Sequence, residues 1–162
     1  DILINNVGGV IKRSSFLNSD DKLWQKVINL NLMSAVKTTR IVTKLLMKSK
    51  NGVILNISSV SSRTGGGGDS LHYATAKAAI NIFTKGLAKE LKKIRVVGIA
   101  PSAVDTDFQR KHSSKNRLRK IISETPMGRI GSPQEIAELV YFITSSKSSF
   151  LSGETIFITG GR

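Results

Sequence analysis

Short, almost purely apolar runs that alternate with longer amphipathic segments constrain the fold of this chain most. Four such runs are expected to form strands: Ile2–Ile4, Val53–Ile57, Arg95–Ala100 and Glu154–Ile158. Near-continuous apolar strands are typical of parallel sheets, because helices cover such a sheet on both faces. The alternation therefore predicts an α/β fold with a doubly wound parallel sheet.

The segment between the first two runs is expected to be helical. Ser19 is its predicted N-cap, and Asp20 and Asp21 follow where the helix dipole favours negative charge. Asn51-Gly52 is expected to end it. Apolar residues recur along it at helical spacing: Leu23, Trp24, Val27, Ile28, Val36, Ile41, Val42, Leu45 and Leu46.

Three further helical segments are expected later in the chain. One extends from Leu71 to about Lys93, and a basic stretch extends from Arg110 to Ser123. The last begins at Pro133 with Ser132 as its cap and continues to about Thr144. The glycine run 65–68 opens no helix directly from a strand, so it is interpreted as a mobile loop.

Length and composition favour one domain. The chain has 162 residues, which we assign to a single domain, residues 1–162, without an internal repeat. It contains no cysteine, which excludes disulfides and thiolate metal sites and suits a reducing, cytoplasmic location. No apolar run approaches the roughly 20 residues of a membrane-spanning helix, so no membrane partner is expected.

The charge balance is strongly basic, with a formal net charge of +14 and a pI of about 10.4. Such a balance can indicate nucleic-acid binding. Here the charges are scattered, and no aromatic residues alternate with them as a stacking surface for bases requires. A solvated, lysine-rich surface is therefore predicted, without nucleic acid as a partner. Six of the lysines are expected on solvent-facing helix surfaces: Lys44, Lys48, Lys85, Lys89, Lys92 and Lys93.

Tyr73 and Lys77 are the most informative pair for chemistry. Four residues apart on a helix, they lie on one face about one turn from each other. An ammonium at that spacing is expected to lower the pKa of the phenol from about 10, which suits proton transfer near neutral pH. Ser59 precedes Tyr73 by fourteen positions and could hold a carbonyl or alcohol oxygen beside it. Taken alone, the pair also fits a packed tyrosine and a solvated lysine.

The surrounding motifs follow one known order along almost the whole chain. They are Asn5-Asn6-Val7-Gly8, Asn31, Gly52 to Ser59, Tyr73 to Lys77, Ile94 to Pro101 with Thr106, Gly128 to Ala137, Ser152-Gly153 and Gly160-Gly161. In this order the chain closely resembles the short-chain dehydrogenase/reductase family, in particular the branch of 3-oxoacyl-carrier-protein reductases and tropinone-reductase-like enzymes. The resemblance implies a Rossmann-like fold.

The resemblance also implies catalytic roles. Tyr73 would exchange a proton with the substrate oxygen, and Lys77 would lower its pKa and hold the nicotinamide ribose. Ser59, rather than its neighbour Ser58, would hydrogen-bond the substrate oxygen. Asn31 would hold a water linked to the lysine. The implied reaction is hydride transfer between a nicotinamide and a carbonyl carbon.

The implied cofactor is NADP or NAD. The residues expected to contact it are Asn5, Gly8, Tyr73, Lys77, Pro101, Val104 and Thr106. Asn5 and Gly8 would contact the adenosine end and brace the strand ends, and the loop from Pro101 to Thr106 would contact the nicotinamide carboxamide. Ser102 replaces the glycine of the family pattern, which is expected to shift that loop. His72 has no partner cluster that would suggest a metal, and no metal site is expected.

The family's phosphate-binding turn, Thr-Gly-x-x-x-Gly-x-Gly, does not occur in the sequence. In the family this turn cradles the cofactor pyrophosphate with backbone amides at a helix N-terminus. We therefore expect the chain to correspond to the C-terminal two-thirds of a reductase, truncated before the fourth strand of its sheet. On that expectation, the isolated chain would not turn over.

Two functional hypotheses follow. The first is an NAD(P)-dependent oxidoreductase that interconverts a ketone, or a 3-oxoacyl group, and a secondary alcohol. The second is a catalytically inactive remnant that acts only as an oligomer or binding component.

Two further expectations concern partners. A homodimer or homotetramer is expected, with helices 20–48 and 70–93 paired across a two-fold axis near Ala74, Ala76, Ala78 and Ala79. The basic residues of the stretch 110–123 form either a solvated flexible lid or a surface that steers an acidic carrier-bound substrate.

Overall fold

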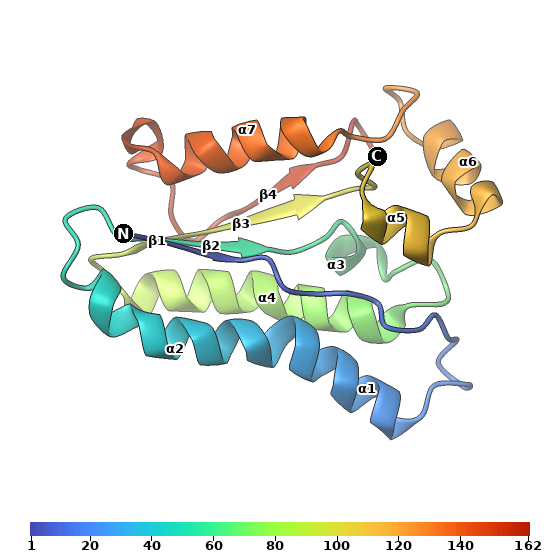
Figure 1. The fold of residues 1–162 in the computed structure, drawn as a ribbon, viewed down its shortest axis with the longest axis horizontal. Coiled ribbons are helices and arrows are strands. Elements are labelled where there is room, and N and C mark those ends of the chain that lie inside the picture. The colour runs from blue at the N-terminus through green and yellow to red at the C-terminus, as the bar shows by residue number, and fades with distance from the viewer.

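The computed structural model describes all residues from 1 to 162 and contains one four-stranded parallel sheet. The strands lie in the order β1-β2-β3-β4 (Figure 1). Their bounds are β1 Ile2–Asn5, β2 Val53–Ile57, β3 Arg95–Pro101 and β4 Thr155–Ile158. All three strand pairs are parallel, so their carboxyl ends meet at one edge of the sheet. The predicted α/β fold is confirmed.

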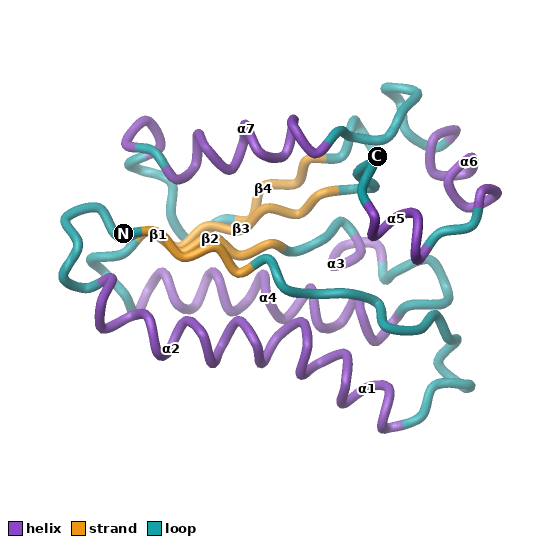
Figure 2. Tube along the Cα trace, viewed as in Figure 1, coloured by secondary structure: helices purple, strands orange, loops and turns teal.

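Helices cover both faces of the sheet (Figure 1). Three long helical segments lie on one face: α1 (Asp21–Ile28), α2 (Ser34–Leu46) and α4 (Leu71–Glu90). The opposite face carries α7 (Pro133–Thr144). The short helices α5 (Asp107–His112) and α6 (Lys115–Ser123) lie beyond the carboxyl ends of the strands, joined by loops (Figure 2). The remaining helical turns are α3 (Ser61–Thr64), η1 (Asn29–Met33) and η2 (Ser146–Ser148).

Alternate residues of the central strands feed two apolar clusters, one on each face. Ile54 and Val96 are paired across β2 and β3 and pack with Leu46 of α2. Their neighbours Leu55 and Val97 are also paired and pack with residues of α7. Because both faces are covered, these strands are apolar throughout. This explains why the sequence predicted β2 with its correct bounds.

The first helix differs from the prediction at its start and in its middle. Its N-cap is Asp20, whose carboxylate accepts a hydrogen bond from the Leu23 amide at 2.8 Å. Ser19 instead donates its hydroxyl to the Phe16 carbonyl and accepts from the Trp24 indole. The predicted continuous helix is interrupted by η1, a π-helical turn, so that α1 and α2 are separate segments.

Two other segments differ from the predictions. The basic stretch predicted from Arg110 to Ser123 forms two helices, because Ser114 starts a new one as the N-cap of α6. The glycine run lies in the connection between α3 and α4, and all four residues, 65–68, have positive φ angles. Only glycine adopts such a succession without strain.

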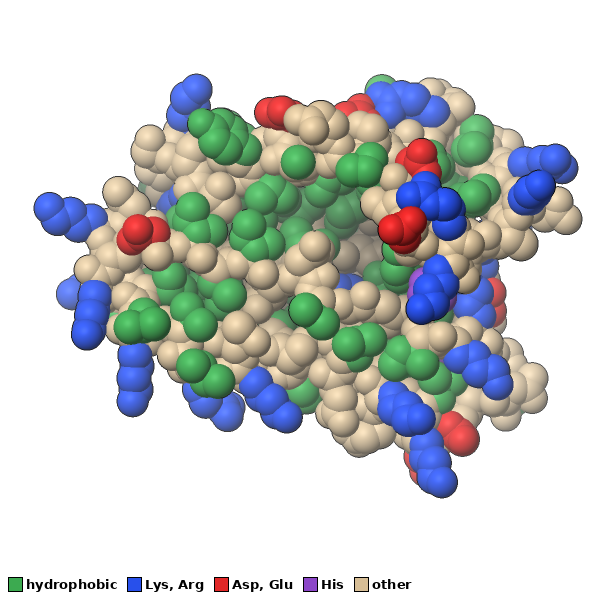
Figure 3. Space-filling model, in the orientation of Figure 1, with side chains coloured by type: hydrophobic (Ala, Val, Ile, Leu, Met, Phe, Trp, Pro, Cys, Tyr) green, Lys and Arg blue, Asp and Glu red, His purple; other side chains and the backbone are tan.

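The charged surface is as predicted. Lys44, Lys48, Lys85, Lys89, Lys92 and Lys93 are all exposed. Figure 3 shows Lys and Arg side chains distributed around the rim of the visible face, with a few acidic groups between them. No helix of the structure has the length and apolar character needed to cross a membrane.

The alanine run predicted to lie between subunits is largely internal. Ala74 and Ala76 are 3% and 0% exposed, packed against the chain's own elements. The most exposed large apolar side chains on these helices are Ile41 and Leu45 on α2 and Ile82 on α4.

Candidate active site

A cavity of about 470 Å³ opens at the carboxyl ends of the strands. Ligands of open parallel sheets bind at this edge, beyond the strand ends. Residues from three strand ends, from α4 and from the α5–α6 region line it. Among them are Asn6, Gly8, Arg13, Ser59, Tyr73, Lys77, Pro101, Ser102, Val104, Thr106, Phe108 and Arg117.

Tyr73 lies in the first turn of α4 and is 9% exposed. Its ring packs with Val10, Val27 and Ala76 in an apolar cluster. Phe108 of α5 contacts this cluster, with its ring centroid 6.3 Å from that of Tyr73. The phenol is therefore held between the long helices and the α5 segment, at the wall of the cavity.

Lys77 lies one turn further along α4 and is 4% exposed. Its Nζ donates to the Ile57 carbonyl at the end of β2 at 2.7 Å and lies 5.8 Å from the centroid of the Tyr73 ring. Burial lowers the pKa of Lys77 to about 8. The predicted shared face of Tyr73 and Lys77 is present, and the alternative of a solvated lysine is wrong.

The pKa of Tyr73 differs from the prediction. Burial raises this pKa above its usual value, and the Ser59 hydroxyl and the Arg13 charge only partly oppose the shift. The Lys77 ammonium makes its hydrogen bond to a backbone carbonyl rather than to the phenol. The expected lowering of the phenol pKa by Lys77 is therefore wrong for the protein without a bound ligand.

The two serines after β2 have different surroundings. Ser58 is buried and donates its hydroxyl to the Lys77 carbonyl at 3.0 Å, which ties the strand end to α4. Ser59 is half-buried, and its hydroxyl accepts from the Ser61 amide at 3.2 Å. Both line the cavity. The Ser59 hydroxyl is the one close enough to affect the Tyr73 phenol.

Asn31 lies inside the π-helical turn η1 and is 1% exposed. Its side-chain oxygen accepts from the Gly9 amide, and its side-chain nitrogen donates to the carbonyls of Gly9 and Val27, each at 2.9 Å. Single π turns occur preferentially at functional sites. The sequence identified Asn31 as a site residue, and η1 places an irregular stretch of backbone around it.

Gly8 lies between Asn31 and Lys77. A Cβ atom at this position would lie 2.6 Å from the Asn31 side-chain oxygen and 2.9 Å from Lys77 Nζ. Only a residue without a side chain fits between these two groups. The glycine thus allows the first loop to approach the lysine closely.

The predicted cofactor residues fall into two groups. Gly8, Pro101, Val104 and Thr106 line the cavity together with Tyr73 and Lys77. Asn5 does not line it; its amide donates to Thr39 at 3.0 Å and to Asn56 at 2.8 Å. Asn5 thereby links β1 to β2 and α2, the bracing that was predicted, while its neighbour Asn6 lines the cavity.

Ser102, the departure from the family pattern, also lines the cavity. Its amide donates to the Ile158 carbonyl at 3.0 Å, which fixes the backbone beside β4. Its hydroxyl oxygen is buried and has no hydrogen-bond partner within the protein. A buried hydroxyl in this state can bind a polar group of a ligand.

Two residues of the cavity, Arg13 and Phe108, were not predicted from the sequence as site residues. Arg117 was expected only as part of the basic stretch 110–123. Arg13 and Arg117 are far apart in the sequence, and both pair with Asp69 in the loop before α4. No local motif signals such a meeting, since it depends on where two loops and helix α6 lie in the fold.

The charge of the cavity lining has one sign. Its basic residues are Arg13, Lys77, Arg117 and Arg162, and no aspartate or glutamate lines it. A lining of this kind attracts anionic ligands, because opposing walls of low dielectric focus the field.

Comparison with known proteins identifies the family. A family model described as enoyl-(acyl carrier protein) reductase matches residues 1–162. The chain belongs to the short-chain dehydrogenase/reductase family. The 3-oxoacyl-[acyl-carrier-protein] reductase of Escherichia coli is 36% identical over 163 residues, which cover 99% of this chain and 66% of that protein. The corresponding Thermotoga maritima enzyme is also 36% identical, with 65% of its length covered.

Solved structures of the short-chain dehydrogenase/reductase family agree. A 7α-hydroxysteroid dehydrogenase complexed with NADH and 7-oxo glycochenodeoxycholic acid has a TM-score of 0.92 at 32% identity, covering 99% of this chain and 63% of that one. A 3-oxoacyl-[acyl-carrier protein] reductase from Brucella melitensis with bound NAD has a TM-score of 0.90 at 33% identity, covering 99% and 61%. A gluconate 5-dehydrogenase from Burkholderia cenocepacia, complexed with NADP and tartrate, has a TM-score of 0.93 at 28% identity, covering 99% and 64%.

These comparisons confirm the predicted family and the Rossmann-like sheet. The chain spans about two thirds of the length of the short-chain dehydrogenase/reductases that it matches. Each of these relatives is named as an enzyme. The alternative of a non-catalytic remnant therefore finds no support in the comparisons.

Proposed function

We propose that the protein is an NAD(P)-dependent oxidoreductase that interconverts a ketone, or a 3-oxoacyl group, and a secondary alcohol. The observation that carries the proposal is the meeting of Tyr73, Lys77 and Ser59 at one cavity beyond the strand ends. The named relatives support it, since they are reductases and dehydrogenases, several of them solved with a nicotinamide cofactor. We assign residues 1–162 to one domain of this enzyme.

The cavity has features that fit a nicotinamide cofactor, either NAD or NADP. Gly8 provides a close approach that a side chain would fill, and the Ser102 hydroxyl is buried without a partner. We assign Gly8, Pro101, Val104 and Thr106 to hold the cofactor, with Lys77 directed at its ribose. Asn5 would act by fixing the loop that contains Gly8, through its bonds to Thr39 and Asn56. When bound, the nicotinamide supplies or accepts the hydride.

The chain's own residues would move the proton and orient the substrate. In the reductive direction the Tyr73 phenol gives its proton to the carbonyl oxygen, and in the oxidative direction the phenolate removes it from the alcohol. The Ser59 hydroxyl holds the same oxygen. Lys77 is positioned to stabilise the phenolate once its Nζ is drawn from the Ile57 carbonyl toward the ribose.

Asn31 would serve this proton transfer indirectly. Both N–H groups of its side-chain amide donate to the carbonyls of Gly9 and Val27, and its oxygen accepts from the Gly9 amide. The π turn around it leaves the backbone of η1 irregular next to Gly8 and Lys77. We assign this backbone, rather than the amide group, to hold the water that connects Lys77 with solvent.

The experiment that tests the function is a cofactor and substrate screen on the purified protein. NADH and NADPH are titrated against it while nicotinamide fluorescence is recorded. The oxidation of each cofactor is then followed in the presence of small ketones and a 3-oxoacyl thioester. Saturable binding of one cofactor together with steady ketone reduction is expected of a protein that carries the phosphate-binding turn together with this chain, and not of residues 1–162 alone. The absence of both in that longer, folded protein would overturn the proposal.

We also propose a homodimer or homotetramer as the working form. Ile41 and Leu45 on α2 and Ile82 on α4 form the apolar surface offered to a second copy, at exposures of 74%, 66% and 72%. Isologous contacts of this kind are the usual route to homo-oligomers. Light scattering should give at least a dimer at micromolar concentration, and Ile41→Glu with Ile82→Glu should shift it toward a monomer. A monomeric wild type would contradict this part.

A further inference from the structure

Arg13 and Arg117, which line the cavity, meet at a single carboxylate, that of Asp69, which lies outside the lining. Arg13 donates through one terminal nitrogen to Asp69 at 3.0 Å, and its Nε donates to the His112 carbonyl at 2.6 Å. Arg117 donates to both oxygens of the same carboxylate, at 3.0 and 3.3 Å. Three segments that are distant in the sequence are thereby joined: the first loop, the loop before α4 and helix α6.

The cluster keeps a surplus of positive charge and of hydrogen-bond donors. Two guanidinium groups share one carboxylate, and no acidic residue lines the cavity. The second terminal nitrogen of each arginine, and the Nε of Arg117, make no hydrogen bond within the protein. Both side chains are only partly exposed, at 24% and 29%, so an anion bound there would be partly shielded from water.

The cluster lies near the proposed proton donor, because Arg13, Arg117 and Tyr73 line the same cavity. A chain of contacts joins them. The Tyr73 ring contacts Phe108, the Phe108 ring centroid lies 5.0 Å from that of His112, and the His112 carbonyl accepts a hydrogen bond from Arg13. The Arg13 charge is close enough to lower the pKa of the Tyr73 phenol. A short molecule with its carbonyl at Tyr73 could therefore reach the arginines with its other end.

We propose that Arg13 and Arg117 form a carboxylate-binding subsite, and that the substrate is a small oxo acid, or in reverse the corresponding hydroxy acid. The inference rests on the proposed function and specifies its substrate class. Asp69 is then a positioning residue that holds the two guanidinium groups side by side. The carboxylate of the substrate would take the donors that Asp69 leaves free.

The chemistry of the two arginines favours a carboxylate. A guanidinium presents parallel N–H groups that match the two oxygens of a carboxylate. The structure contains a different kind of arginine pairing on the outer surface of α5. There Arg110 bonds Asp105 and Asp107, and all three side chains are more than 60% exposed. On α5 one arginine thus bonds two carboxylates. At Asp69 two arginines share one carboxylate, and both arginines line the cavity.

The test compares matched substrates on the protein with its preferred nicotinamide cofactor. The probes are oxo acids in which one to three methylenes separate the ketone from the carboxylate, the methyl ester of each acid, and a 3-oxoacyl phosphopantetheine thioester. We expect a higher kcat/KM for one of the acids than for its ester. Arg13→Gln and Arg117→Gln should each lower this acid-to-ester ratio about 10- to 100-fold, mainly through KM.

The matched control is Arg119→Gln, which removes an exposed charge from the same helix and should leave the ratio unchanged. Arg117→Lys, which keeps the charge without the planar fork, should retain part of the preference. Folding of the variants is verified by thermal melting. If the acid-to-ester ratio is the same in the wild type and in both glutamine variants, the cluster only joins three segments of the fold and binds no carboxylate. A preference for the phosphopantetheine thioester over every acid would overturn the assignment to a small oxo acid.

A binding measurement separates this inference from the proposed function. The saturated carboxylic acid of the preferred length, which cannot be reduced, is titrated by calorimetry against the wild type and the two glutamine variants. Binding that is lost in both variants supports the subsite even if no ketone is turned over. Turnover of ketones without arginine-dependent binding of the acid leaves the function standing and refutes the subsite.

Discussion

Two regions meet at the cavity and are built differently. The region that we call the floor comprises the buried residues Asn31, Ser58, Tyr73 and Lys77: the last two lie on α4, Asn31 lies in the π turn η1, and Ser58 directly follows β2. The rim is the segment 105–124, with the short helices α5 and α6. Floor side chains bond to backbone groups, as Lys77 does to Ile57 and Ser58 does to Lys77. Rim side chains instead form ion pairs with one another and with the loops.

The difference separates chemistry from substrate choice. Hydrogen bonds to buried backbone fix the geometry that proton transfer requires, and breaking them costs stability. Exposed ion pairs such as Arg110–Asp107 contribute little to stability, so the rim can change its charges and contacts without unfolding the floor. Mutations in the floor should therefore change turnover, and those that remove a buried charge or hydrogen bond should also change stability, whereas rim mutations should change substrate preference.

The largest expected effect is at Tyr73. Tyr73→Phe removes only the oxygen that carries the proton, and we expect turnover to fall by about 10²- to 10⁴-fold. The melting temperature should change little, because the ring remains in its apolar cluster. Steady-state kinetics and thermal melting measure both quantities.

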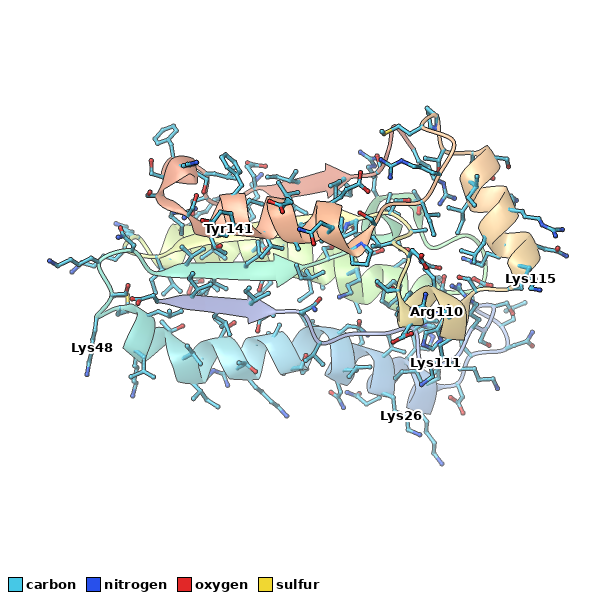
Figure 4. All side chains as sticks on the ribbon, turned by 45° about the horizontal axis from the view of Figure 1, so that its top comes forward. Lys26, Lys48, Arg110, Lys111, Lys115 and Tyr141 are labelled. Carbon is cyan, nitrogen blue, oxygen red and sulfur yellow. The ribbon has the colours of Figure 1, made fainter.

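The matched control is the other tyrosine of the chain. Tyr141 lies on α7 and is 73% exposed, and Figure 4 labels it there, apart from the floor. Tyr141→Phe should leave turnover unchanged. If Tyr73→Phe keeps more than a tenth of the wild-type rate, Tyr73 is not the acid/base.

The second prediction concerns Lys77, where turnover and stability should change in opposite directions. Lys77→Met should lower turnover at least tenfold and yet stabilise the fold at pH 7. The pKa of Lys77 is about 8 in the folded protein, against 10.5 in the unfolded chain, so burying the ammonium costs about 3 kcal/mol. Losing the bond to the Ile57 carbonyl offsets about 1 kcal/mol of that gain.

The pH dependence gives the sign of this effect. Because the folded pKa of Lys77 is lowered, its cost is fully present below pH 8 and disappears as the pH rises through about 10.5. The free energy of unfolding, from urea titrations at pH 7 and at pH 10, should therefore differ between variant and wild type mainly at pH 7. If Lys77→Met is less stable than the wild type at pH 7, interactions of the Lys77 ammonium outweigh the cost of burying it, and the prediction is wrong.

Sequence predicted the floor well and the rim poorly, for a physical reason. Tyr73 and Lys77 lie one helical turn apart, and Ser59 follows a strand whose apolar run marks its end, so local periodicity places all three. The Asp69 cluster depends on two loops meeting helix α6, and no local pattern of the sequence encodes that. The pKa of the phenol was also missed, because the number of apolar atoms around a side chain depends on tertiary packing.

The third prediction tests the rim by charge. Lys111, Lys115 and Arg119 are exposed and form no ion pair, so they are the positive charges of the rim that are free to act at a distance. Lys111→Glu with Lys115→Glu should raise KM for an anionic or carrier-bound substrate about two- to fivefold at low ionic strength. Salt of about 1 M should abolish the difference, because it shortens the screening length to about 3 Å.

A remote pair of lysines provides the control for this charge reversal. Lys48 lies after α2, at the end of the molecule opposite to the rim (Figure 4), and the exposed Lys44 precedes it by one turn on α2. Lys44→Glu with Lys48→Glu changes the net charge equally and should leave KM closer to the wild type. If both lysine pairs change KM equally, the net charge of the protein and not the position of the rim determines KM. If the rim pair changes KM for a small neutral ketone as much as for the anionic substrate, the rim does not steer charge and acts only as a lid.

The smallest expected effect compares two histidines, one in each region. His72 is 1% exposed beside Tyr73, its ring in edge contact with Trp24 at 6.0 Å. Neither ring nitrogen has a hydrogen-bond partner of normal geometry. Burial lowers the pKa of His72, and the Arg13 charge acts in the same direction; the Lys12 backbone and the Asp69 charge partly oppose this lowering. His112 in the rim is half-buried, and burial lowers its pKa too, with Lys111 and Arg13 acting in the same direction.

A lowered histidine pKa means that the unfolded chain binds a proton before the folded protein does. The free energy of unfolding should therefore fall as the pH drops below about 6.5, by at most about 1.4 kcal/mol per pH unit for each histidine. His72→Leu, which suits the apolar contact with Trp24, should remove most of this fall, and His112→Gln should remove less. Urea titrations at half-unit steps from pH 5 to pH 7.5 measure the slopes. If His112→Gln changes the slope of the free energy of unfolding more than His72→Leu does, the more strongly desolvated imidazole is that of His112. The rim, and not the floor, would then be the region that holds its side chains away from water.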